Sequence, residues 1–507
     1  MYKILTVTAF GFIFELENDQ CYNTDTYDVY LNGERYLSTD KNVVSIFSLK
    51  SDTVYRVDVL GHSFEVRTKK PEFLIDVRDY NATGDGVTDD TSAINLAIYT
   101  APVFSTVYIP EGVYMVDQIL LKSGVDIFLA KGAVLRQNTC RKKLAILKAY
   151  QKSYDFDDVR VNASWEGHPL DSFCSLIYGK DVFNVHIYGE GMLDGNGSEG
   201  DFWINPKVKN MAFRPKNILL VGCKNIQVSG ITSVNSASWN IHPMYSQHLA
   251  FRALTIKSEA DSPNTDGLNP ESCENVEIIG CHFSVGDDCI AIKAGKYYMS
   301  VKHYQPTKHI IIRNCLMENG HGGVVIGSEM ACGVYDVTVT QCLFRNTDRG
   351  LRVKTRRGRG ALAVVDGIKF DNVKMENVRH CFVVNMFYNC DPDGKSDYVK
   401  SKTITAKDEL TPTVKNIIVS KINAIDITGC AVFIYGLPEN KVSEITVKDS
   451  SFEFSNQRVI ECPAMMDDFD PIEKLGFHIK NVRNAIFLRN KIKGEYATIG
   501  VKNAQNK

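Results

Sequence analysis

ENVEIIGCHFS, residues 274–284, is the stretch of sequence that decides the fold. Its apolar and polar residues alternate, which is typical of a strand with one buried face and not of a helix. The same unit, a polar residue followed by an alternating strand and a turn, recurs at intervals of roughly 23 to 34 residues with one longer gap. Its other copies are KNIQVSGITSVN (224–235), QHLAFRALTI (247–256), KHIIIRNCLMEN (308–319), YDVTVTQCLFRN (335–346), DGIKFDNVKMEN (366–377), KNIIVSKINAID (415–426) and SEITVKDSSFE (443–453). A repeat of this length indicates a solenoid.

The alternation and the content of Val, Ile, Thr and Phe favour strands over helices as the repeating element. We therefore predict an all-β fold, a right-handed parallel β-helix over residues 71–507. Its coils would stack about 4.8 Å apart, with inward side chains forming the core and outward ones forming ladders. A helix over residues 89–99 is expected to cap the open N-terminal end, where unpaired strand edges invite aggregation.

Residues 1–70 differ from the repeats and consist of short alternating runs with a hairpin signal at Asn32-Gly33. They predict a small antiparallel β-sandwich. The pattern and length resemble a fibronectin type III-like module, and KKPEF at 69–73 would be the linker that follows it. We expect a structural or substrate-guiding role for this domain.

The overall charge excludes some classes of partner. The 507 residues carry a formal net charge of -2, and the pI is near 6.6. We therefore expect no nucleic acid partner and no binding to an anionic membrane, and an anionic ligand would need a local basic patch. No stretch has the roughly 18 uncharged apolar residues of a membrane-spanning helix. The sequence leaves the oligomeric state open.

The N-terminal residues 1–19 are a poor secretory signal, because they lack a small-x-small cleavage site and continue into strand-like sequence. A cytoplasmic location is therefore expected, although secretion stays an alternative. The fourteen cysteines are scattered without CxxC pairs or Cys-His spacing. They predict buried free thiols in preference to a disulfide framework.

Three aspartates stand in two clusters, Asp266 in the tripeptide NTD and the pair Asp287-Asp288 in GDD. Asp266 and Asp287 are roughly twenty residues apart, about one coil, so we expect them at equivalent positions on neighbouring strands. Carboxylates at such a distance repel, which raises the pKa of one and places an acid beside a base. Hydrolysis of a glycosidic bond needs this combination, because an acid protonates the leaving oxygen while a carboxylate activates water.

Two later segments add to the same face. GHG places His321 between glycines, and the strand RGLRVK carries Arg352 and Lys354, which point the same way because they are two residues apart. An outward Arg and Lys suit a sugar carboxylate, and we interpret the arginine-rich run 349–359 in the same way in preference to a nucleic-acid patch. The substrate would then contain a uronic acid.

The order NTD, GDD, GHG and R-x-K on a β-helix resembles glycoside hydrolase family 28, the polygalacturonases. The resemblance covers nearly everything from about residue 73 onward. It implies hydrolysis of α-1,4-galacturonosidic bonds with inversion, Asp287 as the general acid, and Asp266 with Asp288 as the groups that hold and deprotonate water. It also implies that His321 supports protonation of the acid. Inverting enzymes usually separate their carboxylates by roughly 6.5 to 9.5 Å, more than stacking on adjacent coils suggests.

The same resemblance implies that Arg352 and Lys354 hold the galacturonate carboxylate. Lys293, Trp239 and His242 are further candidates for substrate binding, although Trp239 and His242 could equally be packing residues at the rim of the cleft. We expect no cofactor and no metal.

The N-terminal domain and the segments ASWEGHP, DGNG and SWNIHP (163–169, 194–197 and 238–243) resemble the bacterial exo-acting members of the family. Exo enzymes close one end of the cleft with inserted loops, and the segments 136–170, 296–307 and 387–412 are longer than a coil needs. We therefore expect an exo-acting enzyme on oligo- or polygalacturonate. The alternatives are an endo-polygalacturonase or substituted-galacturonan hydrolase, a calcium-dependent pectate lyase, and a catalytically silent carbohydrate-binding solenoid.

Overall fold

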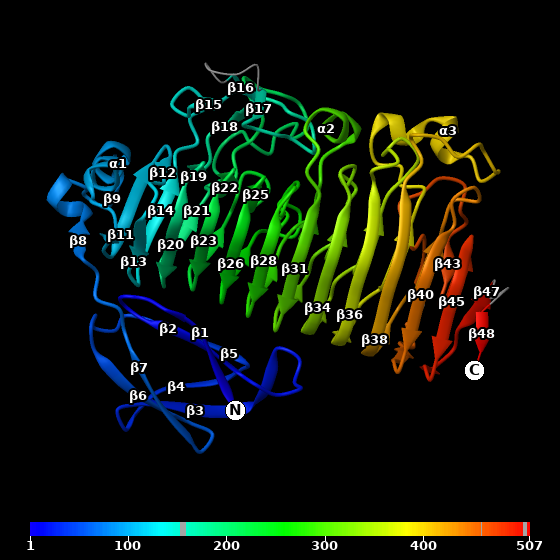
Figure 1. Ribbon diagram of the computed structural model, residues 1–507, viewed down its shortest axis with the longest axis horizontal. Helices are drawn as coiled ribbons and strands as arrows, with labels where there is room; N and C mark the ends of the chain where they lie inside the picture. The colour runs from blue at the N-terminus through cyan, green and yellow to red at the C-terminus, as the bar shows by residue number, and fades with distance from the viewer. Residues whose placement is uncertain (153–158, 458, 500–503, 507) are drawn as a thin grey trace.

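The computed structural model describes residues 1–152, 159–457, 459–499 and 504–506 (Figure 1). Most of the chain forms a long right-handed parallel β-helix, which confirms the predicted fold class. An antiparallel domain lies against one side of this solenoid (Figure 1). The two parts are described in turn.

A long sheet supplies one side of the solenoid, and among the described residues it contains 24 strands. Its strands are β8 Phe73–Asp76, β9 Asp85–Asp89, β10 Ser105–Ile109, β11 Gly112–Val116, β13 Val125–Leu129, β14 Ala133–Gln137, β20 Phe183–Gly189, β21 Met192–Asp194, β23 Lys224–Ser229, β24 Thr232–Val234, β26 Gln247–Arg252, β27 Thr255–Lys257, β28 Glu274–Ile279, β29 His282–Ser284, β31 Thr307–Arg313, β32 Leu316–Glu318, β34 Val334–Arg345, β36 Val364–Glu376, β38 Thr413–Ile427, β40 Val442–Lys448, β41 Ser451–Phe454, β45 Val482–Leu488, β46 Lys491–Lys493 and β48 Ala504–Asn506.

A second set of parallel strands closes each coil and positions the site. It is divided into two sheets. The first contains β12 Ile119–Leu120, β19 Ile177–Lys180, β22 Ile218–Val221 and β25 Ile241–Met244; the second contains β30 Asp288–Ile292, β33 Gly322–Ile326, β35 Arg349–Lys354, β37 His380–Asn385, β39 Cys430–Tyr435, β44 Leu475–Lys480 and β47 Ala497–Ile499. Single bridges through Leu268 join the two, so the coils are continuous here.

The core is built from stacks of identical positions in successive coils. Val276 pairs in register with Leu249 on one side and Ile310 on the other, and all three side chains are buried. The motif ENVEIIGCHFS therefore contributes one rung, as its alternation predicts. Apolar contact continues from coil to coil without a gap.

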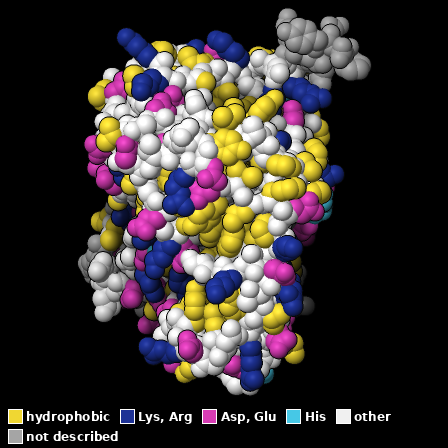
Figure 2. All heavy atoms as spheres, turned by 90° about the vertical axis from the view of Figure 1, so that its left-hand side faces the viewer, with side chains coloured by type: hydrophobic (Ala, Val, Ile, Leu, Met, Phe, Trp, Pro, Cys, Tyr) yellow, Lys and Arg dark blue, Asp and Glu magenta, His cyan; other side chains and the backbone are white. Residues whose placement is uncertain are grey.

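The N-terminal end of the solenoid is closed by helix α1 (Thr91–Thr100), close to the predicted 89–99. Ile94, Ala97 and Ile98 face inward and cover the first coil. The outside of this cap also carries apolar side chains, including Tyr99 and Phe104, which are 78% and 65% exposed. Hydrophobic side chains gather on this end face in Figure 2.

The N-terminal domain consists of two antiparallel sheets, ordered β1-β2-β5 and β4-β3-β6-β7. Their strands are β1 Tyr2–Val7, β2 Phe12–Leu16, β3 Asn23–Leu31, β4 Glu34–Lys41, β5 Val43–Ile46, β6 Val54–Val59 and β7 His62–Arg67. Antiparallel pairing ends at Arg67, and parallel pairing begins at Phe73 in β8. The division into domains 1–70 and 71–507 and the likeness of the first to a fibronectin type III module both stay predictions.

An apolar cluster and a buried ion pair fix this domain to the solenoid. The cluster contains Ile13, Val43, Phe47, Phe128, Tyr188 and Ile279. Beside it, Arg313 donates two hydrogen bonds, of 2.7 and 2.9 Å, to the carboxylate of Glu15, and Asn314 donates a third at 2.7 Å. We expect the two domains to move as one body.

The three long segments noted in the sequence rise from the turns of the coils. They carry the remaining elements, which are β15 Ile146–Leu147, β16 Tyr150–Lys152, β17 Val159–Val161, β18 Ser172–Phe173, α2 Tyr297–Lys302, the 3-10 helix η2 Pro392–Lys395 and α3 Asp397–Lys400. The other small elements are η1 Val77–Tyr80, β42 Ile460–Glu461 and β43 Ile472–Glu473. In Figure 1, α2 and α3 stand above the same edge of the solenoid.

All fourteen cysteines are free, and ten of them are buried. This agrees with the free thiols expected from the sequence. Among the described residues, no helix is long and apolar enough to cross a membrane.

Candidate active site

One pocket brings together almost all the candidate residues. It lies over the second set of strands and has a volume of about 240 Å³. Of the nine residues that the sequence nominates, eight line it: Asp266, Asp287, Asp288, His321, Lys293, Arg352, Lys354 and Trp239. The ninth, His242, does not.

The register of the strands corrects one expectation. Leu268 pairs with Ile290, so the aspartate that lies alongside Asp266 is Asp288 and not Asp287. The reason is that the coil from Leu268 to Ile290 is one residue longer than the interval from Asp266 to Asp287. Asp287 stands just before β30, and Asp288 is the first residue of that strand.

Asp288 is held ionised by the cations around it. Its Oδ2 accepts a hydrogen bond from Lys354 Nζ at 2.7 Å, and its Oδ1 lies 3.9 Å from Arg352 Nη1. Burial alone would raise the pKa of Asp288, but the charges of Lys354, Arg352 and Lys293 outweigh burial and lower the pKa to about 2. Asp288 is therefore a carboxylate at any pH near neutrality.

Asp287 is the most accessible of the three, with 27% of its side chain exposed. His321 Nδ1 lies 3.8 Å from Asp287 Oδ1, and the His321 side chain itself is 55% exposed. Desolvation in the pocket and the negative charge of Asp288 raise the pKa of Asp287, although Lys354 and His321 partly oppose this. Asp287 can therefore hold a proton, and its exposure makes it the carboxyl group best placed to reach a bound ligand.

Asp266 is almost fully buried and accepts a hydrogen bond from Asn269 at 2.8 Å. Lys293 Nζ is 4.0 Å from it. Burial and the neighbouring charge of Asp287 raise the pKa of Asp266. Asp266 and Asp287 therefore both keep a proton to higher pH than an ordinary aspartate, in contrast to Asp288.

The remaining candidates for substrate binding are Lys293, Trp239 and His242. Lys293 Nζ lies 2.8 Å from Glu329 Oε2 and above the ring of Trp239, 5.3 Å from its centre. Trp239 lines the pocket, but only 5% of it is exposed. His242 is fully buried behind Trp239, and its Nε2 is 2.8 Å from Glu271 Oε2. The expectation that His242 touches substrate is therefore corrected, because no part of its side chain reaches the pocket.

The arginine-rich run is also reinterpreted. Of its side chains, only Arg352 and Lys354 line the pocket. Arg356, Arg357 and Arg359 are at most 2% exposed and pair with carboxylates of the scaffold. The arginines after Lys354 differ from the R-x-K pair because β35 ends at Lys354, and the chain then leaves the pocket.

Five further pocket residues come from outside the family motifs, and the sequence reasoning did not name them. They are Glu166, Lys207, Glu329, Tyr388 and Asp391. Three of them belong to the long segments 136–170 and 387–412, whose length was the only signal for them. The ring of Tyr388 faces both cations of the R-x-K pair, 5.9 Å from the Arg352 guanidinium carbon and 5.5 Å from Lys354 Nζ.

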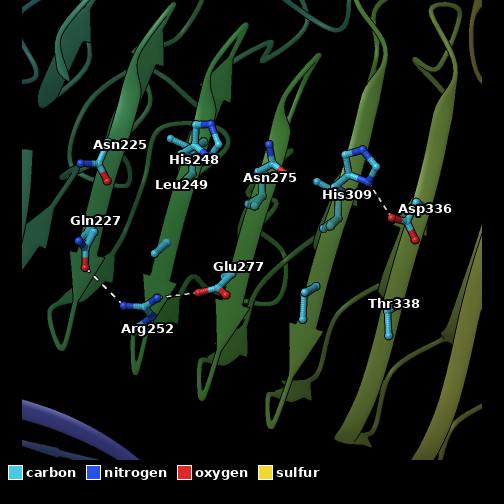
Figure 3. A pocket seen from close by; sticks show the side chains of 14 residues that line it. Asn225, Gln227, His248, Leu249, Arg252, Asn275, Glu277, His309, Asp336 and Thr338 are labelled. Carbon is cyan, nitrogen blue, oxygen red and sulfur yellow. Dashed lines mark hydrogen bonds and ion pairs between the residues drawn. The ribbon is translucent and has the colours of Figure 1, made fainter. Parts of the chain in front are cut away.

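A larger hollow lies elsewhere, on the outer face of the long sheet (Figure 3). It measures about 420 Å³ and is crossed by Arg252, which bonds Gln227 and Glu277. His309 contacts Asp336 at its far side, at 2.7 Å. The NTD, GDD, GHG and R-x-K residues are all absent from its lining, so this hollow is not the catalytic pocket.

The acidic, histidine and cysteine side chains do not form a metal site in the described parts of the chain. No group of three or more His, Cys, Asp and Glu side chains in the described parts of the chain is arranged to hold a metal ion. At the aspartate cluster, Asp288 already faces two cations of the protein, Lys354 Nζ at 2.7 Å and Arg352 Nη1 at 3.9 Å.

The fold and the pocket together define a class of protein, a parallel β-helix that gathers three carboxyl groups and several cations in one pocket. The chain belongs to glycosyl hydrolases family 28, whose family model matches residues 100–467.

Similar proteins agree with this assignment. A probable polygalacturonase of Vitis vinifera is 31% identical over 330 residues, 63% of this chain and 64% of the relative, so the chain spans just under two thirds of that protein's length. The endo-polygalacturonase of Pectobacterium carotovorum subsp. carotovorum is 28% identical over 83% of this chain and 99% of its own. The family 28 exopolygalacturonase of Yersinia enterocolitica has the same fold, with a TM-score of 0.74 at 17% identity over 100% of this chain and 98% of that one.

Proposed function

We propose that this protein hydrolyses α-1,4-galacturonosidic bonds of oligo- or polygalacturonate from a chain end, with Asp287 as general acid and Asp288 as the base that activates water. The observation that carries the proposal is the difference between these neighbouring carboxyls. Lys354 keeps Asp288 ionised, while burial and the charge of Asp288 favour the protonated form of Asp287. Two adjacent acids with opposite pKa shifts are what acid-base cleavage of a glycoside requires.

In the proposed mechanism, Asp287 protonates the leaving glycosidic oxygen, and Asp288 takes a proton from the attacking water. Asp288 Oδ1 has no hydrogen-bond partner among the described residues, so it can accept one from water. Asp266 would help to hold that water, and its raised pKa suits a shared proton better than a second full charge. The reaction would invert the anomeric centre, as the family resemblance implies.

Recognition of the acidic sugar is assigned to Arg352. Its Nη2 has no hydrogen-bond partner within the described part of the chain, although the residue is only 4% exposed. A buried, unsatisfied guanidinium nitrogen beside a pocket favours a carboxylate ligand. Lys354 contributes charge but is already bonded to Asp288.

The exo mode is supported by the long segments of the chain, two of which, 136–170 and 387–412, contribute residues to the pocket. The three long segments contact one another: Lys296 N donates a hydrogen bond to Gly167 O at 3.1 Å, and Lys296 Nζ lies 3.1 Å from Asp391 Oδ2. Glu166 and Lys207, which are joined by an ion pair of 3.0 Å, also line the pocket. A pocket of about 240 Å³, smaller than the roughly 300–1,000 Å³ of typical ligand sites, suits a chain end better than the middle of a polymer.

A product time course from polygalacturonate and from trigalacturonate, with and without chelator, tests this proposal. We expect early release of saturated monomer or dimer alone, at a rate that the chelator does not change. An early spread of oligomers would instead favour endo cleavage, the activity for which the Pectobacterium relative is named. Unsaturated products that disappear with chelator would identify a lyase and overturn the hydrolase proposal.

A further inference from the structure

Three arginines that the catalytic site does not use are among the most deeply buried residues of the protein. Arg356, Arg357 and Arg359 follow β35 in the turn TRRGRG and are 0%, 0% and 2% exposed. We call them the arginine clamp. Burying three guanidinium groups is costly unless each is paired, so their partners indicate what they do.

Arg357 joins the solenoid to the third long segment, 387–412. Its guanidinium makes two hydrogen bonds to Glu439, of 2.6 and 2.9 Å, in the turn between β39 and β40. The same group donates to three backbone carbonyls of the segment, Tyr398 O at 3.0 Å, Ser401 O at 2.7 Å and Thr403 O at 3.3 Å. One side chain therefore bonds three residues of the segment, spread over 398–403, to the coil.

Arg356 and Arg359 hold the part of the segment that lines the pocket. Arg356 Nη2 lies 3.1 Å from Asp391 and 2.7 Å from Asp393, and its Nη1 donates to Tyr388 O at 3.4 Å. Arg359 Nη2 is 3.5 Å from Asp391 and donates to Ser328 at 3.2 Å. Asp391 and Tyr388 are both wall residues of the catalytic pocket.

The backbone of the turn adds to this attachment. Gly358 N and Gly360 N donate to Leu410 O at 2.9 and 3.2 Å, and Ala361 N donates to Glu409 O at 2.7 Å. The segment thus wraps around the arginine turn and is bonded to it near both of its ends. Most of the side-chain bonds are partly buried, and together with the backbone bonds they attach the segment to the coil at several points.

We propose that the arginine clamp determines where the polymer is cut: by fixing the segment 387–412 over the pocket, it excludes the middle of a galacturonan chain and admits only an end. The clamp residues touch no reacting atom and are positioning residues. This inference rests on the proposed function, since it concerns which bonds the same acid-base site can reach.

The test removes both charges of one clamp pair, Arg357→Met together with Glu439→Gln, so that no buried charge is left without a partner. Neither residue lines the pocket. In the full-length variant we expect proteolysis within 387–412 to be faster by on the order of tenfold, because the segment opens locally. On polygalacturonate we expect oligomers of mixed length among the first products and a faster loss of viscosity, while cleavage of trigalacturonate continues.

The matched control removes a buried bidentate pair at the other side of the molecule, Glu15→Gln with Arg313→Met. It should leave the products and the proteolysis of 387–412 as in the wild type. Unchanged proteolysis in the clamp variant would show that the clamp does not hold the segment. Faster proteolysis with wild-type products would show that the segment does not set the cut site, and either result overturns the proposal. A wild-type protein that releases no saturated galacturonide fails the proposed function itself, a separate result.

Discussion

Lys354 shows how the contacts of a pocket residue can differ from what its position on a strand suggests. A cation two residues from Arg352 on a strand suggests that both bind the sugar carboxylate. In the structure the Lys354 ammonium is bonded to Asp288 at 2.7 Å and lies 5.5 Å from the ring of Tyr388. Its main effect is therefore on the charge of the proposed base, an effect that depends on a cross-coil contact and is invisible in the local sequence.

We expect Lys354→Ala to shift the acid limb of the kcat/KM profile to higher pH. Asp288 must be ionised to act as a base, so activity falls as the pH drops through its pKa. With Lys354 present this pKa is about 2. Without it, the pKa of Asp288 should rise, because only Arg352 and Lys293 then oppose the effect of burial. Lys354→Arg, which keeps the charge, is the control, and an unshifted acid limb in Lys354→Ala would contradict the assignment.

Replacement of Asp287 by Asn should remove the proposed acid and leave the shape of the pocket intact. General acid catalysis contributes about 10²- to 10⁴-fold, so kcat should fall by at least that much while substrate affinity changes little. Reducing-end release gives kcat, and calorimetric titration with trigalacturonate gives affinity. Near-wild-type turnover would show that another group supplies the proton.

Part of the pocket could be predicted residue by residue from the sequence. The motifs NTD, GDD, GHG and R-x-K identified six of the pocket residues, because each motif stands at a fixed place on a coil. They could not reveal that Asp266 lies beside Asp288, since one extra residue in a turn changes the register. Nor could they reveal that His242 points inward, because the side of the strand on which it packs depends on neighbouring coils.

At the scale of elements, each coil contributes an independent layer to a continuous core. The alternation in residues 274–284 predicted the strand, its buried positions and the stacking, because period two fixes which side chains face inward. It left open how the turns are built. The three long segments were recognisable by length alone, whereas their mutual contacts and the arginine clamp join residues from different coils.

Ile278→Ala tests the stacked core. Ile278 is fully buried and pairs with Phe251 and Ile312 on adjacent coils. The variant should lose about 2–5 kcal/mol of unfolding free energy, measured by chemical denaturation, because it leaves a cavity in the core. Ile311→Ala is the matched control, since Ile311 faces outward on the next strand and is 39% exposed. Its effect should stay within about 0.5 kcal/mol, and a similar loss in both variants would contradict the stacking.

At the scale of the whole molecule, the antiparallel domain and the solenoid are one structural unit. The apolar cluster around Phe47 and the pair Glu15–Arg313 bury side chains from both. None of the catalytic pocket's lining residues belongs to the N-terminal domain. We therefore attribute to this domain a structural role and no direct part in the chemistry.

The accessibility of the cysteine thiols tests whether the whole protein is folded as described. Ten thiols are buried, three are partly exposed, and Cys140 is exposed. A thiol reagent should therefore modify at most four groups in the native protein and all fourteen after unfolding without reductant. Fewer than fourteen after unfolding would mean that some cysteines form disulfides.

Under the proposed exo mode, the contacts that Lys296 makes with Gly167 and Asp391 beside the pocket have a consequence for kinetics on long polymers. For an enzyme that accepts only termini, the effective substrate concentration is the concentration of chain ends. At a fixed mass of galacturonan, doubling the mean chain length halves the number of ends and should halve the initial rate below saturation. Such a protein works fastest on material that another enzyme has already shortened.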